Sequence, residues 1–280
     1  PAKFQGKFTI PSGVTKIASG AFGLCKGLTG VEIPNTVTSI SEFAFEGCTG
    51  LTNLTIPSSV KYIDWKAFKG CENLDVVIRN AEEDVTVGSG ALDDCKSVTW
   101  KIIDESESPL KFKVLTETTA EVTKENCVEG SVTIPSKVVI DGKTYSVVSI
   151  ASYAFKNCKG LTNITIPSSV VNIGTDAFAN SGLTTIELPS SITSFGYGVF
   201  RGCSDLVSVK IPSSVESIGE SAFADCTSLS NLELSSSVKI IGVMAFADCE
   251  NLDLVIDNSE DNVEVRPQAF QNCKSVTWKK

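Results

Sequence analysis

One interval of 23 residues restricts the folds open to this sequence more than any other feature. Two series of cysteines follow it: Cys25, Cys48 and Cys71, and then Cys203, Cys226 and Cys249. Phenylalanine and isoleucine recur at the same interval, as at Phe22, Phe45 and Phe68. A unit this short cannot bury an apolar face by itself, whereas stacked units can. The interval therefore predicts a solenoid of about ten short coils.

The residue pattern of a single unit predicts how each coil is built. From Leu51 to Cys71 the sequence reads LTNLTIPSSVKYIDWKAFKGC. Its first residues alternate apolar and polar, which is typical of a short half-buried strand, and Pro57 ends the strand pairing. Asp64 is placed to cap a helical turn over Trp65 to Cys71. We expect an α/β repeat, with a parallel β-sheet on one face and short strands and helical turns on the other.

The short units are organised in two tandem blocks. The segment Cys71 to Trp100 matches Cys249 to Trp278, so the two blocks end in the same way. Between the blocks, 104–109 has the composition of a linker, and Asp141-Gly142 predicts a hairpin. We predict a first repeat block over 1–103, a linker plus β-hairpin cap over 104–149, and a second repeat block over 150–280.

Written out in this way, the units resemble the BspA-like leucine-rich repeats, whose pattern is close to LTxIxIPSSVTSIGxxAFxGC. The resemblance covers nearly the whole chain apart from the linker and cap, with departures at Leu92 and Ser181, where Phe and Cys are expected. It implies a leucine-rich-repeat solenoid. Members of this family are typically secreted or surface-exposed, and several are regarded as adhesins. The resemblance therefore implies a cell-surface or extracellular protein that adheres to host extracellular matrix or to another cell-surface protein, or to a glycan. Because the chain starts with Pro1 and carries no signal or anchor, we expect a fragment.

The ten cysteines raise two hypotheses, a disulfide framework and a metal site. A tetrahedral zinc site needs close pairs such as C-x₂-C, and this sequence has none. Disulfides between coils need Cα atoms about 4.4–6.8 Å apart, and we expect wider spacing on the helical side. Nine cysteines share one repeat position, so they are predicted to be reduced and buried. Cys127 lies outside the series and is the candidate for an exposed, reactive thiol.

Other chemistry finds little support in the residues. There is no histidine, which removes the commonest general base, and no phosphate-binding loop motif. The acidic runs, such as Glu82-Glu83-Asp84, lack the spacing of a calcium loop. With a net charge of −9 and no basic cluster, nucleic acid is excluded as a partner. We predict no catalytic activity, no cofactor, no metal site and no membrane insertion.

A binding surface is expected on the outward face of the sheet. The candidates precede the last apolar residue of each strand, in a row that begins at Thr9 and continues through Glu32, Thr55, Thr165, Glu187, Lys210 and Glu233. This row lacks the Trp, Tyr and Arg of typical interface hot spots, so a merely solvated sheet face is the alternative. In that case the protein is a structural spacer that displays other domains of a larger surface protein. Either way, we expect a monomer.

Overall fold

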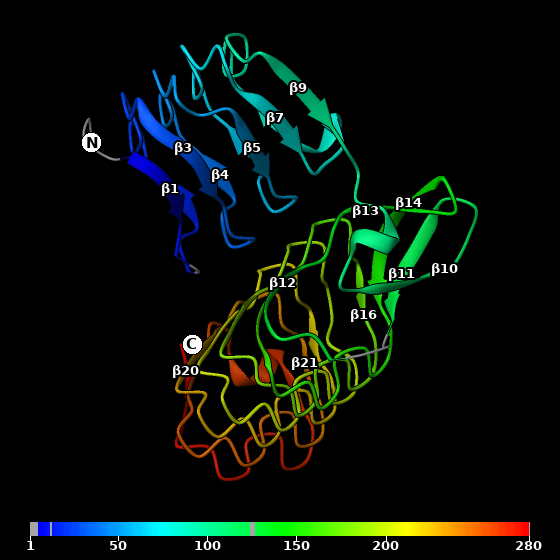
Figure 1. Ribbon diagram of the computed structural model, residues 1–280. Helices are drawn as coiled ribbons and strands as arrows, with labels where there is room; N and C mark the ends of the chain where they lie inside the picture. The colour runs from blue at the N-terminus through cyan, green and yellow to red at the C-terminus, as the bar shows by residue number, and fades with distance from the viewer. Residues whose placement is uncertain (1–4, 12, 124–126, 280) are drawn as a thin grey trace. The chain divides into compact units, whose positions relative to one another are not determined.

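A computed structural model describes residues 5–11, 13–123 and 127–279 (Figure 1). The chain forms two compact units. The first contains residues 1–104 together with 135–141, and the second contains residues 105–134 and 142–280. The domain boundaries drawn from the sequence stay a prediction. Each unit is a stack of coils whose strands pair in parallel.

The first unit contains two sets of parallel strands. On the broad sheet face, β1 (Gln5–Thr9) pairs with β3 (Gly27–Glu32), and β5 (Asn53–Ile56), β7 (Asp75–Ile78) and β9 (Ser97–Trp100) pair in order. A second ladder joins the two-residue strands β2 (Lys16–Ile17), β4 (Ser39–Ile40), β6 (Tyr62–Ile63) and β8 (Thr86–Val87). The strand β13 (Lys137–Ile140) belongs to this unit, where Val139 bridges Asp104.

The second unit repeats this plan after an antiparallel leader. The leader pairs β10 (Lys111–Val114) with β11 (Thr119–Thr123), and β11 pairs in parallel with β14 (Lys143–Ile150). On the broad face, β12 (Gly130–Thr133) pairs with β15 (Leu161–Thr165), and β17 (Thr185–Glu187) pairs with β18 (Ser208–Lys210). The face continues with β20 (Asn231–Leu234), β22 (Asp253–Ile256) and β24 (Ser275–Trp278). The short strands are β16 (Asn172–Ile173), β19 (Ser217–Ile218), β21 (Ile240–Ile241) and β23 (Glu264–Val265).

The predicted helical turns are wrong, and the fold is a β-solenoid rather than an α/β repeat. Asp64 does accept a hydrogen bond from the Trp65 amide, at 2.7 Å, but the residues that follow form turns. The described part of the chain has no α-helix, only the three-residue 3₁₀ segments η1 (Glu82–Asp84), η2 (Glu105–Glu107) and η3 (Glu260–Asn262). The reason is that left-handed residues interrupt each turn, as at Lys66 (φ 50°) and Gly70 (φ 72°).

The backbone of this turn region bonds between coils, not within a helix. The Phe45 amide donates to the Ala67 carbonyl of the next coil at 2.8 Å, and the Gly47 amide donates to the Lys69 carbonyl at 2.7 Å. We call the turn region, which precedes and includes the A-F-x-x-C motif of each coil, the turn corner. Backbone hydrogen bonds join its coils as they join the strands of a sheet, so its amide groups have acceptors without forming a helix.

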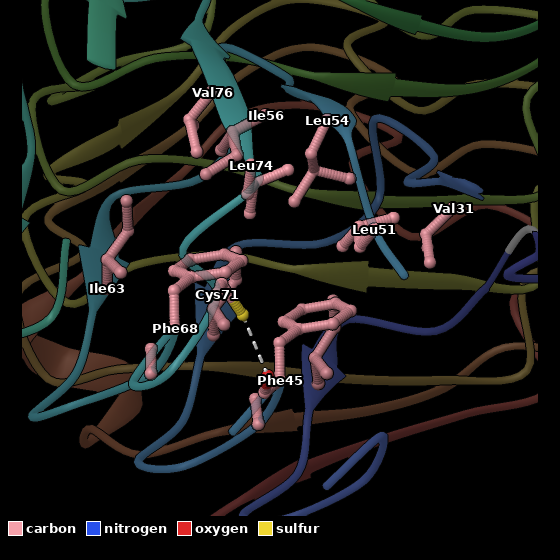
Figure 2. Close-up of a cluster of buried hydrophobic side chains, with 14 of the residues drawn as sticks. Val31, Phe45, Leu51, Leu54, Ile56, Ile63, Phe68, Cys71, Leu74 and Val76 are labelled. Atoms are coloured by element: carbon pink, nitrogen blue, oxygen red, sulfur yellow. Dashed lines mark hydrogen bonds between the residues drawn. The ribbon is translucent and has the colours of Figure 1, made fainter. Parts of the chain in front are cut away.

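Stacked phenylalanines fill the core behind the turn corner. The Phe22, Phe45 and Phe68 rings are nearly parallel, with centroids 5.0 Å apart at each step. Figure 2 shows the Phe45 and Phe68 rings of this stack. In the second unit, Phe155 and Phe178 stack at 5.3 Å. These spacings are close to the ~4.8 Å between strands, so the coils are as tightly stacked at the corner as in the sheet. The wider corner spacing expected from the sequence is therefore wrong.

In six coils the cysteine of the A-F-x-x-C motif donates its thiol hydrogen to a backbone carbonyl of the preceding coil. Figure 2 shows this bond from Cys71 to the Phe45 carbonyl, at 3.1 Å. The same bond to the phenylalanine of the preceding coil is made by Cys48, Cys203, Cys226, Cys249 and Cys273. Burial raises the pKa of the Cys48 and Cys71 thiols to about 12. Eight of the ten cysteines are free, which confirms the prediction that these eight are reduced. We call the position of the cysteine in the A-F-x-x-C motif the ladder position, and the row of cysteines along the stack the ladder.

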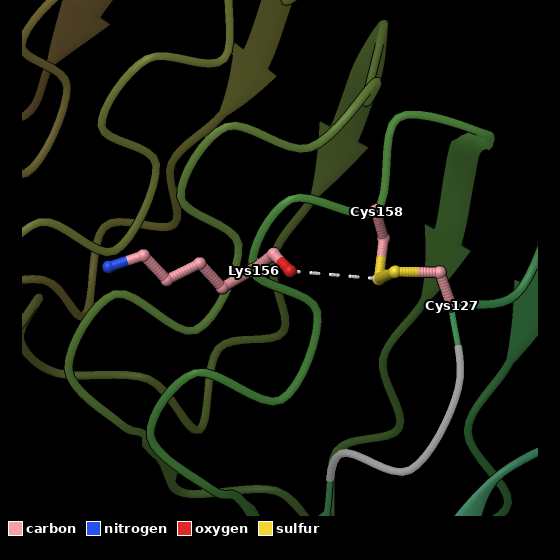
Figure 3. The surroundings of a disulfide bond; sticks show 3 residues. All are labelled: Cys127, Lys156 and Cys158. Carbon is pink, nitrogen blue, oxygen red and sulfur yellow. Dashed lines mark hydrogen bonds between the residues drawn. A yellow bond between two sulfur atoms is a disulfide. The ribbon is translucent and has the colours of Figure 1, made fainter.

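The remaining two cysteines correct the prediction. Cys127 and Cys158 form a disulfide, with their Cα atoms 5.0 Å apart (Figure 3). The sequence predicts a reduced thiol for Cys158 and makes Cys127 only a candidate for a reactive thiol. The bond joins the leader of the second unit to its first coil. Ser181 occupies the ladder position of the next coil, is fully buried, and lies 3.4 Å from the Cys203 sulfur.

Candidate binding surfaces

The six candidate residues of the sheet row all point away from the core. The strand alternation places them there, because the flanking residues are buried, as Leu54 and Ile56 are on either side of Thr55. Five are exposed and Thr165 is half-buried. Glu32 (β3) and Thr55 (β5) lie on the first unit. Thr165 (β15), Glu187 (β17), Lys210 (β18) and Glu233 (β20) lie on the second.

The sheet brings some of these residues into contact. Glu187 faces Lys210 in the register of β17 and β18, and the two side chains form an ion pair. Glu233 pairs with Lys279 instead of another member of the row. On the first unit, the Thr9 hydroxyl donates to Glu32 at 2.8 Å. The charges of the row are thus largely balanced by neighbours on the same face.

A second polar site occurs on the last strands of both units, as the duplicated ends predict. Asp75 accepts hydrogen bonds from Ser97 at 2.6 Å and Lys96 at 2.9 Å. Asp253 accepts from Lys274 and Ser275, both at 2.6 Å. These hydrogen bonds hold the pKa of both carboxyl groups below its usual value. Each aspartate is held by a lysine and a serine at the start of the neighbouring strand, so these bonds join adjacent coils.

Sequence reasoning missed the exposed aromatic residues of the turn corner. Tyr153 and Tyr197 of the second unit keep 48% and 42% of their surface exposed, and Trp65 of the first unit keeps 41%. They stand one or two positions before the A-F motif or its variant, in SYAF, GYGVF and DWKAF. In the sequence, each is an aromatic residue close to the buried phenylalanine of its coil. The prediction of a helical turn for this segment gave no reason to expect these side chains to be exposed. Interface hot spots are enriched in Tyr, Trp and Arg. Tyr153, Tyr197 and Trp65 lie at the turn corner and not on the sheet row.

Charged side chains accompany each aromatic group. In the second unit, the Lys156 ammonium lies 5.0 Å from the Tyr153 ring centre and the Arg201 guanidinium lies 5.8 Å from that of Tyr197. In the first unit, Trp65 packs edge-on against Phe43 at 4.8 Å. There the Lys66 ammonium lies 4.5 Å from the Trp65 ring. Both units therefore present aromatic rings paired with cations at the same part of the coil.

No group of three or more Cys, Asp or Glu side chains is arranged to hold a metal ion among residues 5–11, 13–123 and 127–279. Within those same ranges, no helix has the length and apolar character needed to cross a membrane.

Comparison with known families gives one extensive match. A family model described as the BspA type leucine rich repeat region (6 copies) matches residues 4–112 and 143–277. No curated protein matches the chain.

Solved structures of bacterial repeat proteins are also similar. A leucine rich cell surface protein from Faecalibacterium prausnitzii A2-165 is 30% identical over 93% of this chain, with a TM-score of 0.50, and the chain spans 62% of its length. A leucine-rich repeat protein from Bacteroides ovatus ATCC 8483 is 25% identical, with 98% of this chain and 92% of that one covered and a TM-score of 0.33. Another, from Eubacterium ventriosum ATCC 27560, is 18% identical, with 96% and 83% covered and a TM-score of 0.46.

Proposed function

The chain belongs to the BspA-type leucine-rich-repeat family, and on that premise we propose that it is a surface or secreted protein that adheres to another protein. The partner is a protein of the host extracellular matrix or of another cell surface, and the contact is made by the outward-facing sheet row. The proposal is supported by the leucine-rich-repeat fold, which is similar to that of a bacterial cell surface protein. We propose no catalytic activity for it, and a monomer as the binding form.

One observation carries the proposal: the sheet row is exposed and regularly spaced. Glu32 and Thr55 are exposed on strands of the first unit, and Glu187, Lys210 and Glu233 are exposed on strands of the second. Neighbouring parallel strands lie about 4.8 Å apart, so the row within each unit offers several weak contacts to a partner, which is how solenoids commonly bind.

A second candidate function is favoured by the ion pairs of the row. Glu187 with Lys210, and Glu233 with Lys279, neutralise one another on the surface. A face whose charges are satisfied internally suits a spacer that holds other domains away from the cell and binds nothing itself.

The test is binding of the chain to a panel of immobilised extracellular-matrix proteins. One variant changes Glu32, Glu187, Lys210 and Glu233 to alanine. Its matched control changes Glu42, Glu216, Glu220 and Lys239, which carry the same charges and are exposed away from the row. Saturable binding that only the first variant loses supports adhesion through the sheet. Binding lost in neither variant or in both contradicts this site, and no binding by the unaltered chain favours the spacer.

A further inference from the structure

Three consecutive coils of the second unit build one cluster at the turn corner. The first coil contributes Tyr153 and Lys156, the second Asp176, and the third Tyr197 and Arg201. Backbone hydrogen bonds fix the coils to one another here. The Tyr153 amide donates to the Thr175 carbonyl and the Asp176 amide to the Tyr197 carbonyl, both at 2.9 Å. The cluster therefore sits on a rigid part of the stack.

Asp176 is the centre of the cluster. It is only 3% exposed, and its Oδ2 accepts hydrogen bonds from Lys156 at 2.7 Å and from Arg201 at 3.2 Å. Ala179 stands between Lys156 and Arg201 in the repeat and is too small to separate the two long side chains. One buried carboxylate thus holds two cations, which leaves the cluster with a net positive charge in a chain whose net charge is −9.

The hydrogen bonding of the cluster is incomplete. Among the described residues, Asp176 Oδ1 and Arg201 Nε are buried without a hydrogen-bond partner. Such groups cost free energy when they stay unpaired, so these two atoms leave one acceptor and one donor for a bound group. Gly198 is packed against this carboxylate, because a Cβ on Gly198 would lie 2.1 Å from Asp176 Oδ1.

The two tyrosine rings flank the cations on the surface. They are two coils apart along the stack, or about 10 Å at one strand spacing per coil, which is roughly the length of a disaccharide. Figure 3 shows how Lys156 is placed: its carbonyl lies beside the Cys127–Cys158 disulfide, 4.0 Å from the Cys158 sulfur, while its ammonium end extends away from that bond. The disulfide thus anchors the backbone of one cation of the cluster.

We propose that this cluster of Tyr153, Lys156, Asp176, Tyr197 and Arg201 binds a saccharide that carries carboxylate groups. Exposed aromatic rings stack on the C–H faces of pyranose rings, and a guanidinium fixed beside them pairs with a ring carboxylate. Asp176 is the positioning residue that holds both cations in place. The two exposed tyrosine rings beside the cations favour a sugar chain over an acidic peptide, because a run of acidic side chains offers no apolar face for the rings.

The probe is a hexasaccharide that alternates glucuronate and N-acetylglucosamine, titrated calorimetrically into the whole chain. Tyr197→Ala and Arg201→Gln are expected to weaken binding about tenfold each, through lost stacking or lost charge pairing. Tyr62→Ala and Arg266→Gln are the matched controls, because both residues are exposed and lie outside the cluster. These controls are expected to bind as the unaltered chain does.

Four further arms decide between this site and its competitors. The same hexasaccharide with its carboxyl groups reduced to alcohols is expected to bind at least tenfold more weakly. Equal binding of the reduced sugar, stronger binding of an oligoglutamate peptide, or no binding of the uronate probe overturns the proposal. Loss in Trp65→Ala without loss in Tyr197→Ala moves the site to the first unit and also contradicts it. The sheet variant with four alanines is expected to keep sugar binding. A failure of the sugar proposal can therefore be told apart from a failure of the protein-adhesion proposal.

Discussion

At the residue scale, the ladder position shows what one side chain contributes to every coil. The Cys71 thiol is fully buried and donates to the Phe45 carbonyl at 3.1 Å. Ser181 occupies the same position in another coil and is equally buried. A small side chain with one hydrogen to donate therefore satisfies the position, and the sulfur adds apolar contact with the stacked rings.

We expect Cys71→Ala to lower the free energy of unfolding by about 1–2 kcal/mol, through a small cavity and a carbonyl that loses its donor. Cys71→Ser keeps a donor and is expected to cost less. Urea denaturation of both variants measures the difference. A serine variant less stable than the alanine variant would contradict the role given to the hydrogen bond.

The ladder also makes stability depend on alkaline pH. Burial raises the pKa of Cys48 and Cys71 from 9.0 to about 12. Because the folded pKa is the higher one, the folded state binds more protons, and the stabilisation is complete below pH 9. It is then lost as pH rises from about 9 toward 12. Thermal unfolding followed between pH 7 and 11 is expected to show a falling midpoint above pH 9, and a flat profile would refute the assignment.

At the element scale, the turn corner depends on two kinds of glycine. Gly70 has φ 72°, and an added Cβ would meet its nearest atom at an ordinary 3.6 Å. Gly219 has no positive φ, but its Cβ would lie 2.3 Å from the Phe195 carbonyl oxygen of the preceding coil. One glycine relieves a left-handed backbone, and the other permits close approach of two coils.

We expect Gly70→Ala to destabilise the protein by roughly 1 kcal/mol, which is the cost of a left-handed conformation with a Cβ. Gly219→Ala is expected to cost more, because a backbone atom of the neighbouring coil must move. Chemical denaturation of the two variants compares them directly. The reverse order would show that the coils are free to separate at this point.

The disulfide is the other feature that stabilises the protein at this scale. Cys127 and Cys158 are 31 residues apart, and closing a loop of this length stabilises a fold by about 3–4 kcal/mol in the chain-entropy estimate. Reductant is therefore expected to lower the unfolding temperature of the unaltered chain and to leave Cys127→Ser unchanged. A thiol titration of the denatured, unreduced protein should find eight free thiols. Ten would show that the bond does not form.

At the scale of the whole molecule, folding and the proposed binding rest on different residues. The core is built from stacked phenylalanines, aliphatic strand residues and buried thiols. The sheet row contributes little to it, since the Glu187–Lys210 pair has side chains 71% and 74% exposed. Ion pairs as exposed as this one add little stability.

The variant with Glu32, Glu187, Lys210 and Glu233 changed to alanine is therefore expected to fold normally. Its unfolding free energy should differ from that of the unaltered chain by no more than about 2 kcal/mol, the sum of small surface effects. Denaturation with circular dichroism measures this. A much larger loss would mean that the row is structural, and binding data from the variant would then say nothing about a site.

The sequence by itself determined the solenoid, the buried rows and the outward direction of the candidate residues. It could do so because these follow from a strict 23-residue interval and from alternation along each strand. Leu54, Thr55 and Ile56 take their places from local pattern alone. The shared repeat position predicts nine reduced cysteines, and eight of these are free, whereas Cys158 is in a disulfide.

Only the tertiary structure decided the rest, because those features depend on contacts between coils. The segment Trp65 to Cys71 reads as a helix locally, yet the amides of the turn corner bond to the neighbouring coil, which no pattern within a unit records. The Cys127–Cys158 bond and the grouping of Tyr153, Asp176 and Arg201 join residues from different coils or from the leader. Stacking converts a separation of one repeat into contact at about 5 Å, and that step places the aromatic and charged side chains together.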